Sequence, residues 1–227
     1  MQVSEEKRAA GFAAVDKFVR ADMGCVGLGT GTTAYYAIER VGQRIKEGWD
    51  IVAVATSVET ERLCRERGVR VVGLCEGPPI AVAIDGADEV GPDFSLIKGG
   101  GGALFREKAV ALAAEKFVVV VDEHKIVPKL GKFPLPVEVV PFTLRYVERE
   151  IKRLCPNVAV RMRDGKPFVT DNGNHILDCS FGEIASPAEL DSGLRSINGV
   201  VTTGLFVGMT SHVLVGSVHG VTELNLS

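Results

Sequence analysis

Short, continuous apolar runs alternate with amphipathic segments through the first 122 residues, and this alternation restricts the fold more than any other feature. The apolar runs lie at 25–28 (CVGL), 51–56 (IVAVAT), 80–85 (IAVAID) and 116–122 (KFVVVVD). Uninterrupted Val and Ile runs are typical of parallel strands whose sheet is covered by helices on both faces. We therefore predict an α/β fold with a Rossmann-like, mostly parallel sheet. Helices are expected over about 4–20, with Ser4 as N-cap, and over about 57–67, with Thr56 and Glu59 as a capping box.

The character of the chain changes after residue 122, where prolines become frequent. Pro128, Pro134, Pro136 and Pro141 exclude a continuing helix. Beyond them we expect a strand at 137–140, a helix at about 143–155, strands at 159–163, 167–170 and 176–179, and a helix at about 187–197. This order predicts a smaller α+β domain of ferredoxin-like type. The alternating tail SHVLVGSVHGVTEL is expected to return to the first domain. The Rossmann-like domain would then comprise residues 1–127 and 205–227, and the smaller α+β domain residues 128–204.

Composition excludes several classes of partner. The 227 residues carry a net charge of −3 and are 46% hydrophobic, so no global field favours nucleic acid or an anionic membrane. No apolar run approaches the length of a membrane span, and the N-terminus does not resemble a signal peptide. Five scattered cysteines without a CxxC pair indicate free, buried thiols in a reducing compartment. We expect a cytoplasmic protein.

Every chemically suggestive segment follows a predicted strand. These segments are GTGTT, DGADE, KGGGG and DEHK. In an open parallel sheet the carboxyl ends of the strands line a common crevice. The sequence therefore predicts that the four loops form one site, provided that their strands are neighbours.

The segment GLGTGTT, residues 27–33, resembles a phosphate-binding loop. A dinucleotide fingerprint would have glycine in place of Thr32 and an acidic residue in place of Thr56, so NAD is disfavoured. No Gly-Lys-Ser/Thr sequence follows at Walker spacing. Backbone amides at a helix N-terminus, with the hydroxyls of Thr30, Thr32 and Thr33, suit a phosphate monoester. A purely structural turn is the alternative.

The segment DGADEV places Asp85 and Asp88 three residues apart on a tight turn. Two carboxylates can hydrogen-bond sugar hydroxyls and move protons. A magnesium site and a solvated turn are the alternatives, but no third ligand is obvious. The four histidines have no metal-like spacing, so we predict no metal.

The segment KGGGGALFRE sets a lysine, four glycines and a glutamate between packed regions. A helix that begins at 103 or 104 carries Glu107 in its first turns, where Glu107 could act as a base and Lys98 could stabilise an oxyanion. A flexible linker, or an exposed glutamate that complements the helix dipole, are the alternatives. Lys125, in DEHK, is a further cation for phosphate or substrate hydroxyls, or a solvated lysine.

Taken together, these motifs resemble type A ribose-5-phosphate isomerase over nearly the whole chain. GLGTGTTAYYAIE, DGADEV, KGGGGALFREKAVA, DEHKIVPKLGKFPLPVEVVPF and TDNGNHILD stand in the family's order and spacing. Thr32 stands where serine is common and Gly102 where alanine is common. The resemblance implies a Rossmann-like main domain with a smaller α+β domain, a homodimer or homotetramer, and no cofactor.

The resemblance also implies roles for individual residues. Glu107 matches the catalytic base, and Lys125 matches a substrate-binding lysine. Lys7 matches a phosphate contact. The remaining substrate-binding positions are Thr30, Gly31, Thr32, Thr33, Asp85, Gly86, Ala87, Asp88, Lys98, Gly99, Gly100 and Gly101.

The implied reaction interconverts ribose 5-phosphate and ribulose 5-phosphate through an enediolate, in the non-oxidative branch of the pentose phosphate pathway. We assign Glu107 to the carbon-to-carbon proton transfer, Asp85 or Asp88 to proton movement between oxygens, and Lys98 to the oxyanion. A sugar-phosphate sensor is one alternative, although no helix-turn-helix is appended. A coenzyme A transferase of related fold is another.

Overall fold

The computed structural model describes residues 2–225, with side chains from residue 4 onward. The chain divides into two compact units, each with its own core. Unit 1 comprises residues 1–87, 106–125 and 209–227, and unit 2 comprises residues 88–105 and 126–208. The division expected from the sequence differs mainly in residues 88–105, which it assigns to the Rossmann-like domain.

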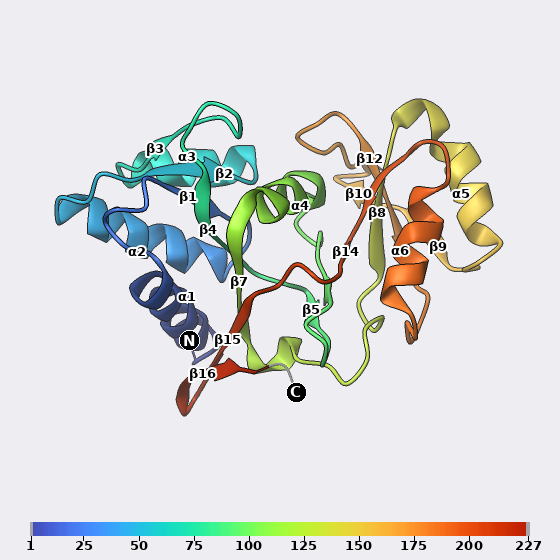
Figure 1. The fold of residues 1–227 in the computed structure, drawn as a ribbon. Helices are drawn as coiled ribbons and strands as arrows, with labels where there is room; N and C mark the ends of the chain where they lie inside the picture. The colour runs from blue at the N-terminus through green and yellow to red at the C-terminus, as the bar shows by residue number, and fades with distance from the viewer. Residues whose placement is uncertain (1, 226–227) are drawn as a thin grey trace. The chain divides into compact units, whose positions relative to one another are not determined.

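Unit 1 is built on a seven-stranded sheet with the order β16-β15-β7-β4-β1-β2-β3 (Figure 1). All neighbouring strands are parallel except the hairpin of β15 and β16. Its strands are β1 (Cys25–Leu28), β2 (Val52–Ala55), β3 (Arg70–Val71), β4 (Ile80–Asp85), β7 (Ala114–Asp122), β15 (His212–Ser217) and β16 (Gly220–Leu224). The C-terminal tail therefore returns to this sheet, as predicted.

Helices cover both faces of this sheet, since its central strands are apolar on both sides. The helices are α1 (Gln2–Phe18), α2 (Ala34–Lys46), α3 (Val58–Glu66) and α4 (Leu104–Ala113). Val26 and Leu28 belong to the core cluster beneath α1, α2 and α3. Gly27, between them, faces α4, and a Cβ at Gly27 would lie 2.5 Å from Val110. The prediction of a doubly covered parallel sheet is confirmed.

Two predicted helix caps are wrong. Helix α1 already begins at Gln2, so Ser4 lies inside it and bonds the hydroxyl of Tyr36 instead. Helix α3 is capped by Ser57, whose hydroxyl accepts the Thr60 amide at 3.0 Å, and not by Thr56. Thr56 is one residue too early because its own amide still bonds Leu28 of the sheet.

Unit 2 contains a four-stranded antiparallel sheet with the order β13-β8-β12-β9. Numbered along the chain, this is the order 4-1-3-2 of the predicted ferredoxin-like arrangement. The elements are β8 (Leu135–Val139), α5 (Leu144–Lys152), β9 (Val158–Val160), β12 (His175–Cys179), α6 (Pro187–Arg195) and β13 (Val200–Thr203). Between β9 and β12, the strand expected at 167–170 is shorter: β10 (Met162–Arg163) and β11 (Lys166–Pro167) form a small hairpin. The 3-10 turn η2 (Pro141–Thr143) precedes α5.

A second, three-stranded sheet explains why residues 88–105 cluster with unit 2. It has the order β14-β6-β5, with β5 (Glu89–Val90), β6 (Leu96–Ile97) and β14 (Leu205–Phe206). The carboxylate of Glu89 accepts the Gly131 and Phe133 amides at 2.7 and 2.6 Å. These contacts fix the segment to unit 2 although the strands are only two residues long.

The exposed glycine in α6 gives a first testable prediction. A Cβ at Gly193 would meet nothing within 4 Å. Glycine costs a helix interior about 0.5–1 kcal/mol relative to alanine. Gly193→Ala is therefore expected to raise the unfolding free energy by about this amount. Thermal unfolding checks it, and a lower melting temperature would contradict the open environment of this position.

Candidate active site

Three of the predicted loops follow neighbouring parallel strands. In unit 1, β4 pairs with β1 on one side and with β7 on the other. The loops that begin at residues 29, 86 and 123 therefore leave the same edge of the sheet. The expectation that these strands are neighbours is confirmed for unit 1, while the glycine run belongs to unit 2.

Asp85 joins two of these loops through backbone amides. It ends β4 and is only 2% exposed. Its Oδ1 accepts the Gly86 amide at 2.7 Å and the Thr30 amide at 3.1 Å. Gly29 permits this approach, since a Cβ there would lie 2.0 Å from the same oxygen. The carboxylate is thus fixed in direction before any ligand arrives.

The hydroxyl of Thr30 contacts three other hydroxyls of the protein. It lies 2.8 Å from the Thr56 hydroxyl, 2.9 Å from that of Ser57 and 3.1 Å from that of Thr60. That this hydroxyl faces a phosphate stays a prediction. The three partners follow β2 and begin α3, and their short polar side chains hold the loop after β1 against the neighbouring strand.

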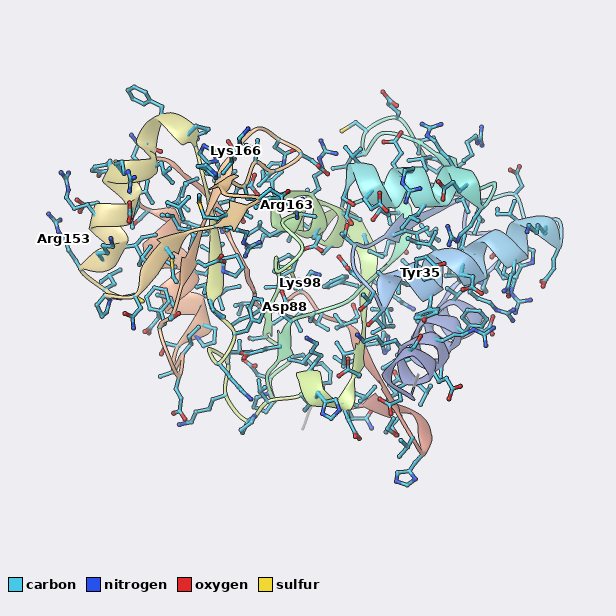
Figure 2. All side chains as sticks on the ribbon, turned by 180° about the vertical axis from the view of Figure 1, so that it is seen from behind. Tyr35, Asp88, Lys98, Arg153, Arg163 and Lys166 are labelled. Carbon is cyan, nitrogen blue, oxygen red and sulfur yellow. The ribbon has the colours of Figure 1, made fainter. Side chains whose placement is uncertain are left out.

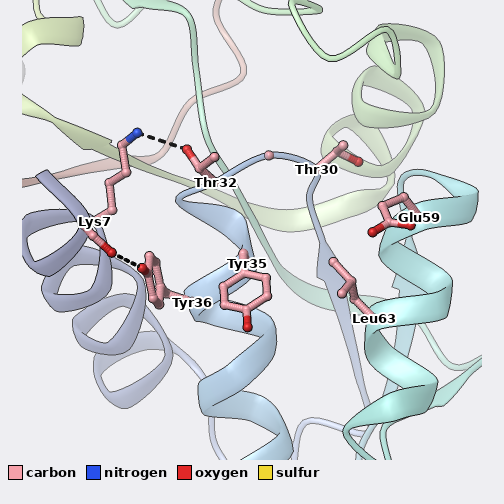
Figure 3. Close-up of a pocket in the computed structure, with 9 residues that line it drawn as sticks. Lys7, Thr30, Thr32, Tyr35, Tyr36, Glu59 and Leu63 are labelled. Atoms are coloured by element: carbon pink, nitrogen blue, oxygen red, sulfur yellow. Dashed lines mark hydrogen bonds between the residues drawn. The ribbon is translucent and has the colours of Figure 1, made fainter. Parts of the chain in front are cut away.

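Lys7 and Thr32 border a cavity beside this loop. The Lys7 ammonium donates to the Thr32 hydroxyl at 3.0 Å and lies 3.8 Å from the Asp122 carboxylate. The cavity has a volume of about 540 Å³. Figure 3 shows Tyr35 and Leu63 on its far wall and Lys7 directed at Thr32. An exposed hydroxyl and a cation at the start of α2 can bind an anion.

Glu107 lies in the first turn of α4 and is 5% exposed. The alternative that it is an exposed glutamate which merely complements the helix dipole is therefore wrong. The packing of Val110 against Gly27 holds the helix on β1, so the position of Glu107 is determined by the core of unit 1. A buried, well-positioned carboxylate is suited to proton transfer.

Lys125 ends the 3-10 turn η1 (Glu123–Lys125), which follows β7. Its side chain is half-buried. The turn is stabilised by the Asp122 carboxylate, which accepts the His124 amide at 3.1 Å. Asp122 thus contacts both this turn and Lys7.

In unit 2, Asp88 and Lys98 flank the glycine run (Figure 2). The Asp88 carboxylate accepts the Gly100 amide at 2.7 Å, and the Asp88 amide bonds Ile97 at 2.8 Å. Lys98 is 2% exposed, and its ammonium lies 5.5 Å from the centre of the Phe206 ring. Lysine is seldom fully buried, so Lys98 is a candidate functional cation rather than a solvated one.

Sequence reasoning missed Arg161, which contacts the glycine run directly. Its guanidinium donates to the carbonyls of Gly99 and Gly100 at 2.7 and 3.2 Å, and it forms an ion pair with Asp178. The one available signal was Asp178 itself, a charged residue in the apolar strand HILDC. Nothing in the sequence connected that strand with the glycines.

Neither the cysteines nor a metal cluster offers competing chemistry. All five thiols are free, and only Cys75 is exposed. Burial raises the pKa of the Cys64 thiol to about 12, which leaves it protonated. Among residues 2–225, no group of three or more His, Cys, Asp or Glu side chains could hold a metal ion. No helix in this range is long and apolar enough to cross a membrane.

The fold and these side chains define a class of protein: a Rossmann-like α/β protein with a glycine- and threonine-rich loop after its first strand and buried acidic groups. The family model described as "Ribose 5-phosphate isomerase A (phosphoriboisomerase A)" matches residues 52–220. The Bacillus mycoides ribose-5-phosphate isomerase A is 45% identical, covering 91% of this chain and 93% of its own length. The Methanothermobacter thermautotrophicus ribose-5-phosphate isomerase A is also 45% identical, covering 94% and 95%.

Solved structures of ribose 5-phosphate isomerases have the same fold as this chain. The Methanocaldococcus jannaschii ribose 5-phosphate isomerase A superposes with a TM-score of 0.91 at 40% identity, covering 97% of this chain and 98% of that one. A D-ribose-5-phosphate isomerase in complex with phospho-erythronic acid superposes with a TM-score of 0.94 at 38% identity, covering 99% and 100%. This chain belongs to the ribose 5-phosphate isomerase A family. The predictions of family, fold class and isomerase function in the pentose phosphate pathway are confirmed.

Proposed function

We propose that this chain interconverts ribose 5-phosphate and ribulose 5-phosphate with Glu107 as the base that moves the proton between carbons. The observation that carries this assignment is the burial of Glu107 in the first turn of α4, in a chain of this family. In the aldose-to-ketose direction the carboxylate takes the proton from C2, giving an enediolate. The resulting carboxylic acid exchanges its proton with solvent and then protonates C1.

The phosphate group of the substrate is assigned to the loop after β1. The exposed Gly31 and Thr32, the N-terminus of α2 and the Lys7 ammonium supply donors and positive charge. Thr30 and Thr33 would shape this loop, since Thr30 is bonded within unit 1 and Thr33 is buried. Lys125 is proposed as a further cation for the phosphate or a substrate hydroxyl.

Charge that develops on the substrate oxygens requires donors and a proton carrier. We assign Lys98 and the amides of the glycine run, Gly99–Gly101, to the oxyanion of the enediolate. Asp85, with Gly86 and Ala87, and Asp88 are assigned to substrate hydroxyls. One of these two aspartates would move the proton between O1 and O2 and assist ring opening. Donors directed at a developing oxyanion typically contribute about 10²–10³ in kcat.

Two further properties follow as proposals. We propose that the chain acts as a homodimer or homotetramer and in the cytoplasm. Light scattering of the purified protein tests the first, and a monomeric mass would contradict it.

We predict that activity needs no added metal. The carboxylates of this mechanism act as acids and bases, and no cluster of three His, Cys, Asp or Glu side chains suited to a metal lies within residues 2–225. Ketose formation from ribose 5-phosphate should therefore be unchanged after dialysis against a chelator. Loss of activity that magnesium restores would favour the metal alternative for Asp85 and Asp88.

Ketose formation also distinguishes the alternatives. A sugar-phosphate sensor would bind ribose 5-phosphate without converting it, and a coenzyme A transferase would not convert it either. Appearance of ribulose 5-phosphate in proportion to protein concentration supports the proposal, and binding without any ketose would overturn it.

A further inference from the structure

We propose that Arg161, oriented by Asp178, is a positioning residue that fixes the glycine run for catalysis. The inference rests on the proposed function, because it gives the amides of this run and Lys98 their place in the reaction. Every contact it uses lies within unit 2. Neither residue was among the expected site residues.

The guanidinium of Arg161 divides its donors between a carboxylate and two carbonyls. Nε donates to Asp178 Oδ2 at 3.0 Å, and Nη2 donates to Asp178 Oδ1. Nη1 donates to Gly99 O at 2.7 Å and to Gly100 O at 3.2 Å. The side chain is only 14% exposed. The planar, five-donor fork of arginine permits this geometry, whereas a lysine ammonium has no such fixed fork.

Holding these two carbonyls also sets the direction of the amides that follow them. Because each peptide unit is planar, the carbonyl of Gly99 fixes the N–H of Gly100, and the carbonyl of Gly100 fixes the N–H of Gly101. The Gly100 amide is directed at Asp88, at 2.7 Å. We call Arg161 and Asp178, with the hydrogen bonds from Arg161 to Gly99 and Gly100, the clamp. The clamp therefore orients the Gly101 amide and the Asp88 carboxylate through one short segment.

The run needs such a clamp because glycine has no side chain to restrict its backbone. Gly99 and Gly102 adopt φ values of +101° and +86°, where glycine is favoured. Fixed groups of unit 2 contact both ends: a Cβ at Gly99 would lie 3.3 Å from Pro136, and one at Gly102 would lie 2.5 Å from the Phe168 ring. The Phe168 amide in turn donates to the carbonyl of Arg161 at 2.8 Å. Between these ends, the Gly102 amide bonds the Gly99 carbonyl at 3.0 Å and the Gly100 amide bonds Asp88. The guanidinium is the side chain that bonds the carbonyls of both Gly99 and Gly100.

The face of the β8–β12 sheet that carries the clamp is separate from the face that carries the core. Val137 and Leu177 pack in the core cluster with α5 and α6. The alternate residues Pro136 and Asp178 point to the other face. Arg161 and Asp178 are therefore not needed to fill that core, which leaves the glycine run as the group they serve.

The test compares Arg161→Met with Arg153→Met, an exposed arginine of the same unit that pairs with Glu150. Turnover of Arg161→Met should fall about tenfold to a hundredfold, with KM changed less than about threefold, because ground-state binding is retained. Arg161→Lys should not restore turnover, since the fork is missing. In Arg161→Ala, added ethylguanidinium should raise kcat several-fold, whereas ethylammonium at the same concentration should not. Arg153→Met should match the wild type.

Amide hydrogen exchange provides a readout that does not depend on activity. Exchange in residues 99–102 should become faster in Arg161→Met and stay unchanged in Arg153→Met. Wild-type exchange rates in this segment, or wild-type kcat in the folded Arg161→Met protein, would overturn the inference. An inactive wild-type protein would instead overturn the proposed function, while the exchange comparison would still decide whether the clamp exists.

Discussion

Replacement of Glu107 by glutamine should reduce kcat by about a hundredfold to ten-thousandfold, the usual contribution of a positioned general base. Glutamine has nearly the same shape but cannot accept the carbon-bound proton. Glu107 is buried in the first turn of α4, so its carboxylate is held in position by the packing of that helix. Binding of ribose 5-phosphate should remain close to that of the wild type.

Steady-state kinetics and calorimetric binding of ribose 5-phosphate check this prediction. The matched control is Glu115→Gln, an exposed glutamate near the start of β7. It should retain wild-type kcat. Near-normal turnover in Glu107→Gln would require a different base. Weaker binding of ribose 5-phosphate together with a lower melting temperature would indicate a structural role instead.

Gly29→Ala should lower both the stability of the protein and its activity. A Cβ at this position would lie 2.0 Å from Asp85 Oδ1 and 2.6 Å from the Asp85 Cβ, so rotation of the aspartate side chain cannot relieve the clash. Overpacking a buried site typically costs about 1–3 kcal/mol. Displacing the carboxylate from the Thr30 and Gly86 amides adds about 1–3 kcal/mol for buried groups left without partners.

We therefore expect Gly29→Ala to lower the melting temperature by several degrees and to reduce kcat about a hundredfold or more, as expected when a proton-transfer group is misplaced. Thermal unfolding and ketose formation by the folded fraction measure the two effects separately. Gly193→Ala, which adds the same methyl group in open space, is the control. Unchanged stability and activity in Gly29→Ala would show that Asp85 is not held as described.

The main sheet was predictable because its signal is local and strong. Each apolar run is long enough to identify a buried strand. Because adjacent parallel strands end at the same edge of a sheet, the loops that follow them are expected to lie together. The helix that begins at Leu104 was expected from the glycine run before it, whereas the burial of Glu107 in its first turn became evident only in the structure. The alternating tail was expected to form a strand that returns to the first domain, and its strand β15 pairs with β7 in parallel.

The remaining features depend on contacts between segments far apart in the sequence. Strands β5 and β6 have two residues each and carry no periodicity, so the carboxylate of Glu89 and the pairing with β14 decide where residues 88–105 belong. The Thr30 hydroxyl finds partners 26–30 residues away. Arg161 reaches the carbonyls of Gly99 and Gly100 across about 60 residues, as the separations of 62 and 61 show.

The central claim is that a carboxylate, Glu107, carries a proton between C2 and C1 of the substrate. Incubation of the wild-type protein with ribose 5-phosphate in deuterium oxide, followed by NMR and mass spectrometry of both sugar phosphates, tests it most directly. The account predicts ribulose 5-phosphate with deuterium at C1, and loss of both conversion and exchange in Glu107→Gln. Ketose that forms without any deuterium, or undiminished exchange in Glu107→Gln, would contradict it.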